Sequence, residues 1–214
     1  MRQMRGFTLV EMLAAIFVLL LFMGVAFAAL FPVLSYLSPA QAKINTQQNA
    51  VPLLYKLQRE VRQSDYRAMF IWQSPSANPL PASLTDIVDF AVASAKTGTA
   101  GTPCFPGGDF VTEAGTGQPM WQGFDVFMLQ NSALKCVFEP ITPQAAWPNS
   151  TQAATAFTAA LAVTNPAVFG NAVLDIKVKS DATTFVTDYQ IKAVSTVDGH
   201  SNATTYTEDI LTRN

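Results

Sequence analysis

Glu11 stands where a charged residue is least expected. It lies near the start of a long apolar run, and no charged side chain occurs from Met12 to Ala42. A carboxylate placed at depth in a membrane-spanning helix costs about 2 to 3 kcal/mol. An ionisable group in such a place therefore predicts a function, exercised together with a partner group that offsets its charge.

The sequence has two cysteines, Cys104 and Cys136, whose thiols could form a disulfide or bind a metal. In an exported domain such a pair forms one disulfide by default, and two free thiols are the alternative. His200 is the only histidine, and there is neither a CxxC nor an HxxxH spacing. The sequence therefore predicts no metal site and no cofactor.

Motifs of known catalytic sites do not occur in the sequence. It contains no G-x-S-x-G, no H-E-x-x-H, no P-loop and no dinucleotide-binding fingerprint. Four aspartates, at 175, 181, 188 and 198, are spread through expected strands and turns, where such side chains commonly bond their own backbone. We therefore expect a protein that is not an enzyme.

The first 37 residues contain the element that must position Glu11. The apolar run over residues 7–37 exceeds the roughly 20 residues that cross a bilayer, and Arg2 and Arg5 precede it. The positive-inside rule then places the N-terminus in the cytoplasm and the remainder outside. Two other interpretations are open: a plain membrane anchor, or a cleaved secretory signal ending at Ala26-Phe27-Ala28.

The segment Gly6-Phe7-Thr8-Leu9-Val10-Glu11 resembles the processing motif of type IV prepilins and type II secretion pseudopilins. This resemblance implies that a prepilin peptidase cuts between Gly6 and Phe7 and methylates the new amine of Phe7. It also implies that Glu11 pairs with the N-terminal amine of a neighbouring subunit. The implied partners are the peptidase, other pilin or pseudopilin subunits and, before assembly, the lipid of the bacterial cytoplasmic membrane.

The resemblance also implies a domain plan. Residues 1–6 would be a leader, 7–37 a transmembrane and polymerisation helix, 38–72 an amphipathic continuation, and 73–214 an exported β-rich head with a long loop at 74–123 that includes short strands such as 87–92. Leu53, Leu57 and Val61 follow the helical period, whereas Pro32, Pro39 and Pro52 predict kinks or interruptions.

Strand patterns dominate the second half of the chain. Residues 124–129 and 134–138 read as a hairpin, and 173–179, 185–194 and 204–211 as further strands, with a turn at Asp198-Gly199. Residues 153–163 read as a short helix. The expected fold is α+β, a long N-terminal helix packed on a mostly antiparallel sheet.

Residues 57–63 narrow the resemblance to J-type pseudopilins and related minor pilins, and so to a minor subunit of a pilus, a competence pseudopilus or a secretion pseudopilus. Some pseudopilins hold calcium in the region of the four aspartates, but the ligand spacing of a dedicated loop is missing here. With a net charge of −2 and no Lys/Arg cluster, no nucleic-acid partner is expected. A membrane-tethered binding domain that never polymerises and a secreted hydrolase are the competing functions.

Overall fold

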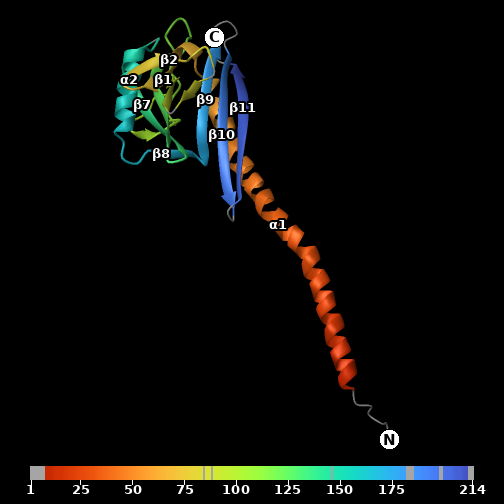
Figure 1. Cartoon of the computed structure of the whole chain (residues 1–214). Helices are drawn as coiled ribbons and strands as arrows, with labels where there is room; N and C mark the ends of the chain where they lie inside the picture. The colour runs from red at the N-terminus through yellow and green to blue at the C-terminus, as the bar shows by residue number, and fades with distance from the viewer. Residues whose placement is uncertain are drawn as a thin grey trace.

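A computed structural model describes residues 8–83, 85–87, 89–145, 147–181, 186–197 and 200–211. One helix, α1 (Leu9–Val61), leads into a head made of strands, as Figure 1 shows. Its residues are mainly Leu, Ala, Met, Phe and Val, and its start is fixed by Thr8 as N-cap. Pro32, Pro39 and Pro52 lie inside the helix without ending it, and it curves along its length (Figure 1).

The helix ends at Val61, so the expected continuation to residue 72 is wrong. Asp65 caps a single 3-10 turn, η1 (Tyr66–Ala68), by accepting a hydrogen bond from the Arg67 amide at 2.8 Å. The run that follows, Met-Phe-Ile-Trp, is apolar, aromatic and β-branched, and it forms strand β1 (Met69–Gln73).

A seven-stranded sheet forms the centre of the head. Its order is β2-β1-β4-β6-β7-β5, β8 also pairs with β7, and every pairing is antiparallel. Its other strands are β2 (Ser76–Pro79), β4 (Asp89–Ser94), β5 (Thr102–Pro103), β6 (Trp121–Gln130), β7 (Ala133–Ala145) and β8 (Ala167–Asn171).

The hairpin expected around residues 124–138 is confirmed by β6 and β7. Asn131 and Ser132 connect the two strands with φ of 52° and 58°. Positive φ at both central residues is the geometry of a two-residue hairpin turn whose twist matches that of the strands.

A second sheet has the order β11-β10-β9-β3 and is also antiparallel. It consists of β3 (Thr85–Ile87), β9 (Val173–Asp181), β10 (Val186–Val197) and β11 (His200–Leu211). Strands β9, β10 and β11 confirm the strands expected at 173–179, 185–194 and 204–211. Residue 185 and the predicted turn at Asp198-Gly199 lie outside the described residues.

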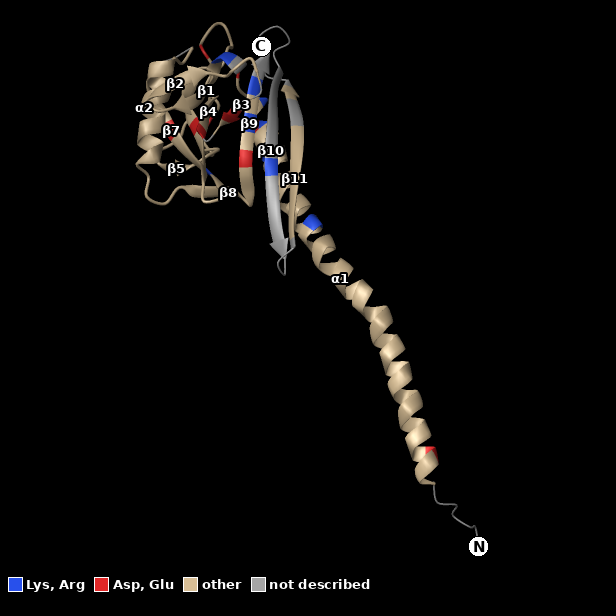
Figure 2. Ribbon diagram, viewed as in Figure 1, with Lys and Arg blue, Asp and Glu red and all other residues tan. Residues whose placement is uncertain are grey.

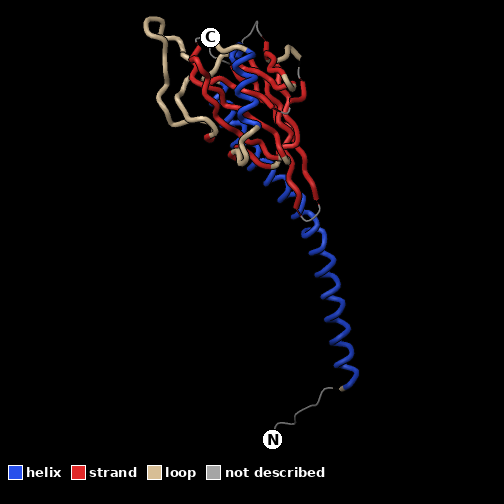
Figure 3. Tube along the Cα trace, turned by 90° about the vertical axis from the view of Figure 1, so that its left-hand side faces the viewer, coloured by secondary structure: helices blue, strands red, loops and turns tan. Residues whose placement is uncertain are grey.

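The head is layered, with the seven-stranded sheet buried on both faces. Helix α2 (Ser150–Leu161), which confirms the short helix expected at 153–163, covers one face. The upper half of α1 and strand β9 cover the other, and Figure 3 shows this half of α1 rising among the strands. Along β6 the side chains alternate: Phe124, Val126 and Met128 pack toward α2, and Phe127 packs toward α1.

The segment 74–123, expected as a long loop with short strands such as 87–92, contains more regular structure than that. It supplies β2, β3 and the central strand β4, on which Phe90 and Val92 are buried toward α1 and Ala91 and Ala93 toward α2. Proline and glycine around these strands mark turns between short strands here. The part with little regular structure begins after β4. Overall, the expected α+β fold is confirmed, with two sheets in place of one.

Candidate functional site

The N-terminus of α1 is capped by a capping box formed by Thr8 and Glu11. The Glu11 amide donates to Thr8 Oγ1 at 3.3 Å, and Glu11 Oε2 accepts from the Thr8 amide at 3.0 Å and from its hydroxyl at 3.1 Å. Two backbone N–H groups at the helix start are thereby satisfied. The carboxylate is held beside the first turn of α1, three positions after Thr8. Gly6 and Phe7, the predicted cleavage pair, lie outside the described residues.

The apolar part of α1 that follows Glu11 is not covered by any other part of the chain that the structure describes. Every residue from Thr8 to Leu37 except Ala26 is exposed, and no side chain of this stretch is buried. The large exposed side chains include Leu9, Phe17, Phe22, Phe31 and Leu37. The described chain has one helix that is long and apolar enough to cross a membrane, with a mean hydropathy of 2.8 over its most apolar window. A surface of this size needs lipid or other protein to cover it.

Charged side chains are also unevenly distributed between the exposed apolar part of α1 and the rest of the chain. Figure 2 shows Lys, Arg, Asp and Glu gathered on the head and on the part of α1 next to it, whereas the lower helix carries only the acid near its start. Lys43 is the first charged residue after Glu11. The described chain therefore has an apolar rod with one carboxylate, and its other charged side chains lie on the head and on the adjoining part of α1.

Small residues allow the head to sit closely on α1. Ala42, Thr46 and Ala50 are fully buried at i, i+4 and i+8, so they share one face of the helix. Strands β10 and β11 pack on α1, and Thr46 Oγ1 donates to the carbonyl of Asn202 in β11 at 3.3 Å. Higher on the helix, Leu53, Leu57 and Val61 enter the main core, which confirms the apolar stripe read from the sequence.

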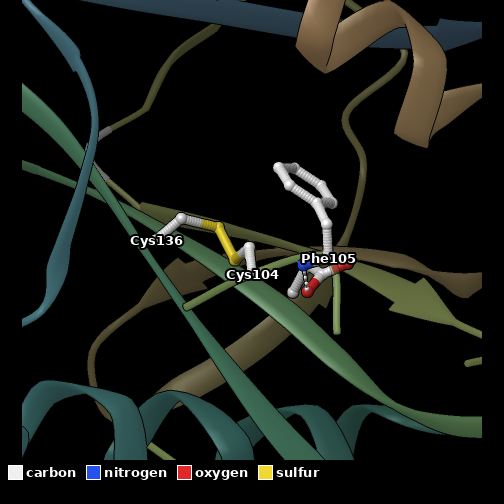
Figure 4. Close-up of a disulfide and its surroundings, with 4 residues drawn as sticks. Cys104, Phe105 and Cys136 are labelled. Carbon is white, nitrogen blue, oxygen red and sulfur yellow. Dashed lines mark hydrogen bonds between the residues drawn. A yellow bond between two sulfur atoms is a disulfide. The ribbon is translucent and has the colours of Figure 1, made fainter. Parts of the chain in front are cut away.

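Cys104 and Cys136 form a disulfide, with 5.5 Å between their Cα atoms. The bond ties the irregular segment after β4 to strand β7 (Figure 4). The next residue, Phe105, has a φ of 64°, and its ring lies 5.2 Å from that of Phe169 and 6.2 Å from that of Phe127. The disulfide therefore holds an aromatic side chain in the core facing α1.

Asp125 is a buried acid that the sequence analysis did not single out. Its side chain points to the α1 side of β6, it is 2% exposed, and its Oδ1 accepts a hydrogen bond from the Phe105 amide at 3.2 Å. Burial raises the pKa of Asp125 to about 7; the Phe105 hydrogen bond opposes this rise, the charge of Glu60 adds to it and Lys96 opposes it. The available signal was an acid inside the apolar run Phe-Asp-Val-Phe, which alternation alone does not distinguish from a surface residue.

No cluster in the described ranges suits a metal ion, since no three His, Cys, Asp or Glu side chains lie together in a way that could hold one. Asp175 is on β9, while the side chains of Asp181, Asp188 and Asp198 lie outside the description, as does that of His200. The structure brings the two cysteines together in the head. Glu11 lies in the first turn of α1, and the start of α1 is far from the head (Figure 1).

Residues 1–27 match a protein family described as the prokaryotic N-terminal methylation motif. The chain is thus type IV prepilin-like at its N-terminus. The matched residues include Gly6, Phe7 and Glu11 and most of the apolar helix, so the motif and the exposed rod coincide. No curated protein and no solved structure matches the chain.

This prepilin-like motif indicates the class of protein to which the long apolar helix belongs. It supports a type IV pilin- or pseudopilin-like protein with a single apolar N-terminal helix, a class of structural rather than catalytic proteins. It also implies processing by a prepilin peptidase and association with pilin-type subunits. The match ends within α1, so it does not reach residues 57–63, on which the J-type resemblance depends.

Proposed function

We propose that this chain is a minor pilin or pseudopilin, a structural subunit of a type IV pilus, a competence pseudopilus or a type II secretion pseudopilus. In this proposal a prepilin peptidase cuts between Gly6 and Phe7 and methylates Phe7. Before assembly the chain is a single-pass protein of the cytoplasmic membrane, with its N-terminus in the cytoplasm and its head outside. It then leaves the lipid to join a filament.

One observation carries the proposal: an apolar helix that is exposed from Leu9 to Leu37 begins with a methylation motif. Lipid can cover such a helix in a monomer, and helices of other subunits can cover it in a filament. The same surface therefore serves as an anchor first and as a packing surface later. Arg2 and Arg5, on the N-terminal side of the span, support the cytoplasmic position of the N-terminus.

Glu11 supplies the electrostatic part of assembly. Cutting after Gly6 creates an amine near the start of the helix, where water is scarce once the helix is in the membrane. A charge buried there without a partner is costly, and pairing with the amine of a neighbouring subunit offsets that cost. Assembly with the correct helix register is the arrangement that provides this pair.

The domain limits are part of the same proposal. Residues 1–6 are the leader, 7–37 the membrane and polymerisation segment, and the remainder the support and head. The upper part of α1 is the support, ending at Val61, and the exported head follows it. The resemblance of residues 57–63 to J-type pseudopilins supports a minor rather than a major subunit.

Mass spectrometry of the mature N-terminus tests the function in the native host. We expect the protein to begin at N-methylated Phe7. An intact Met1 would instead support a tethered domain that does not polymerise, and a start near Ala29 would support a secreted protein behind an ordinary signal peptide.

Two glycines offer a matched pair of variants for this test. Gly6→Ala places a Cβ next to the bond to be cut, where an enzyme must approach the backbone closely, and we expect slower cleavage. Gly24→Ala places a Cβ where, apart from its chain neighbours and the backbone of its own helix, no atom lies within 4 Å, so the processing should be normal. Equal processing of the two variants would contradict the assigned cleavage site.

A further inference from the structure

Strand β11 has an edge unlike the other edges of the two sheets. The edge strands β2, β3, β5 and β8 are two to five residues long, and Pro79 and Pro103 interrupt the bonding capacity of two of them. Strand β11 has 12 residues, contains no proline, lysine or arginine, and pairs among the described residues with β10 on one side. Short strands, prolines and lysines are the usual protection of exposed edges, and β11 lacks all three.

An apolar groove lies beside the middle of this strand. Val51, Leu54, Tyr55 and Gln58 of α1 line it together with Tyr206 and Thr207 of β11, around a volume of about 320 Å³. Val51 and Tyr55 are 54% and 69% exposed. Along β11, Ala203, Thr205 and Thr207 are exposed and alternate with the half-buried Thr204 and Tyr206. An added strand would thus find backbone partners on β11 and an apolar surface on α1 for every second side chain.

The direction of β11 limits what can pair with it. Asn202 lies against Thr46, and Tyr206 and Thr207 lie against Leu54 and Gln58, so β11 runs in the same direction as α1, away from the N-terminus (Figure 1). A second copy anchored in the same membrane has its β11 pointing the same way. Two such strands could meet only in parallel, the less stable pairing.

The partner strand must therefore run toward the membrane, antiparallel to β11. A second copy has few edge strands that run in this direction. Its β3, β5 and β8, which run that way, are two to five residues long. The exposed apolar side chains at Leu37, Ile44 and Val51 also continue the surface of the membrane segment up to the groove. A neighbour packed along that surface through its own N-terminal helix would place its head beside β11.

We infer that residues Ala203–Thr207 of β11 accept a strand from a different pilin-type subunit, which runs antiparallel to β11 and places alternate apolar side chains in the groove of α1. This inference rests on the proposed function, since it names the partner surface used when the subunit assembles. It assigns the chain a heterotypic neighbour at its head in addition to contacts made by the apolar helix.

Photocrosslinking in the native host tests the assignment. A photoreactive amino acid replaces Thr205 on β11 or, as the matched control, the exposed Thr155 on α2. We expect an adduct at Thr205 whose partner peptides, identified by mass spectrometry, come from another protein with an N-terminal methylation motif, and no such adduct at Thr155. An adduct with lipid, with a second copy of this chain, or with no protein would overturn the inference.

Proline substitutions separate pairing from folding. Adjacent N–H groups on a strand point to opposite edges, so one of Thr204→Pro and Thr205→Pro removes a bond to β10 and the other removes a bond at the outer edge. With the photoreactive residue at Thr207, the outer-edge variant should keep its melting temperature and lose about tenfold in adduct yield. The other variant should have a lower melting temperature. The melting temperatures therefore show which of the two residues bonds to β10 and which lies at the outer edge.

The N-terminus of each sample distinguishes failure of the inference from failure of the function. If Phe7 is methylated and the protein enters filaments, but the outer-edge proline leaves the adduct unchanged, the strand assignment alone is wrong. If Phe7 is not the first residue, the proposed function fails with it.

Discussion

At the scale of single residues, Asp125 links the stability of the head to pH. Its pKa is raised from an ordinary 3.8 to about 7, so the folded chain binds a proton more tightly than the unfolded chain does between these values. The free energy of unfolding must then fall as the pH rises from about 4 to about 7, by up to roughly 4 kcal/mol, and stay level above that. Asp89, whose pKa burial raises to about 6, contributes in the same direction.

Asp125→Asn should therefore flatten the pH dependence of unfolding. The amide oxygen can still accept the hydrogen bond of Phe105, while the cost of a buried negative charge disappears, so the variant should be more stable than the parent at pH 8. Urea unfolding of the full chain in detergent at several pH values measures this, with the exposed Asp109→Asn as the control. A variant less stable than the parent at pH 8 would show that the charge itself stabilises the head, through Lys96.

Glu11 has a local and an intermolecular role that substitutions can separate. Glutamine at this position preserves the capping box with Thr8 but removes the charge, whereas valine removes both. We expect Glu11→Gln and Glu11→Val to be cut and methylated normally, and both to be largely absent from filaments. Immunoblots of sheared filaments and of membranes measure the two pools. Normal assembly of the glutamine variant would mean that the cap, and not the charge, is what matters.

At the scale of elements, the close approach of α1 to β10 and β11 depends on small side chains. Ala50 is fully buried between them, and a larger side chain there must push the strands away or distort its own rotamer. Ala50→Leu should lower the free energy of unfolding by about 1 to 3 kcal/mol. Its exposed neighbour gives the control, since Asn49→Leu should change stability by less than about 0.5 kcal/mol. Thermal unfolding of both variants in detergent provides the measurement, and equal effects would contradict the packing described.

Elements with a local signature were predictable from sequence. The apolar helix, helix α2 and the β6–β7 hairpin each follow from periodicity, capping or turn residues close together in the chain. Strand β4 was predicted only as a short strand at 87–92 within a surface loop. Its place at the centre of a sheet could not be predicted, because its six residues lie among prolines, glycines and serines, and its burial depends on strands β1 and β6 on either side. The division into two sheets and the burial of Asp125 likewise arise from packing between distant segments. The motif at Gly6, Phe7 and Glu11 was recognisable because its spacing is local.

At the scale of the whole molecule, the chain divides into an exposed apolar segment of α1, up to Leu37, and a head with its own hydrophobic core. Among the described residues, the buried hydrophobic side chains all lie from Ala42 onward, and the disulfide joins two segments of the head. The apolar segment up to Leu37 contributes nothing to this core. Its loss should therefore affect solubility and assembly and leave the fold of the head intact.

Truncation before Ser38 tests this division directly. A chain of residues 38–214 exported to an oxidising compartment should be soluble without detergent, carry the Cys104–Cys136 disulfide and unfold cooperatively. The full chain should require detergent or membrane, because the side chains from Leu9 to Leu37 are exposed to solvent in the isolated chain. Circular dichroism and thiol titration measure the fold and the disulfide. Aggregation of the truncated chain would show that the lower helix also supports the head, since the upper half of α1, from Ala42 to Val61, would then be insufficient to hold β9, β10 and β11 in place.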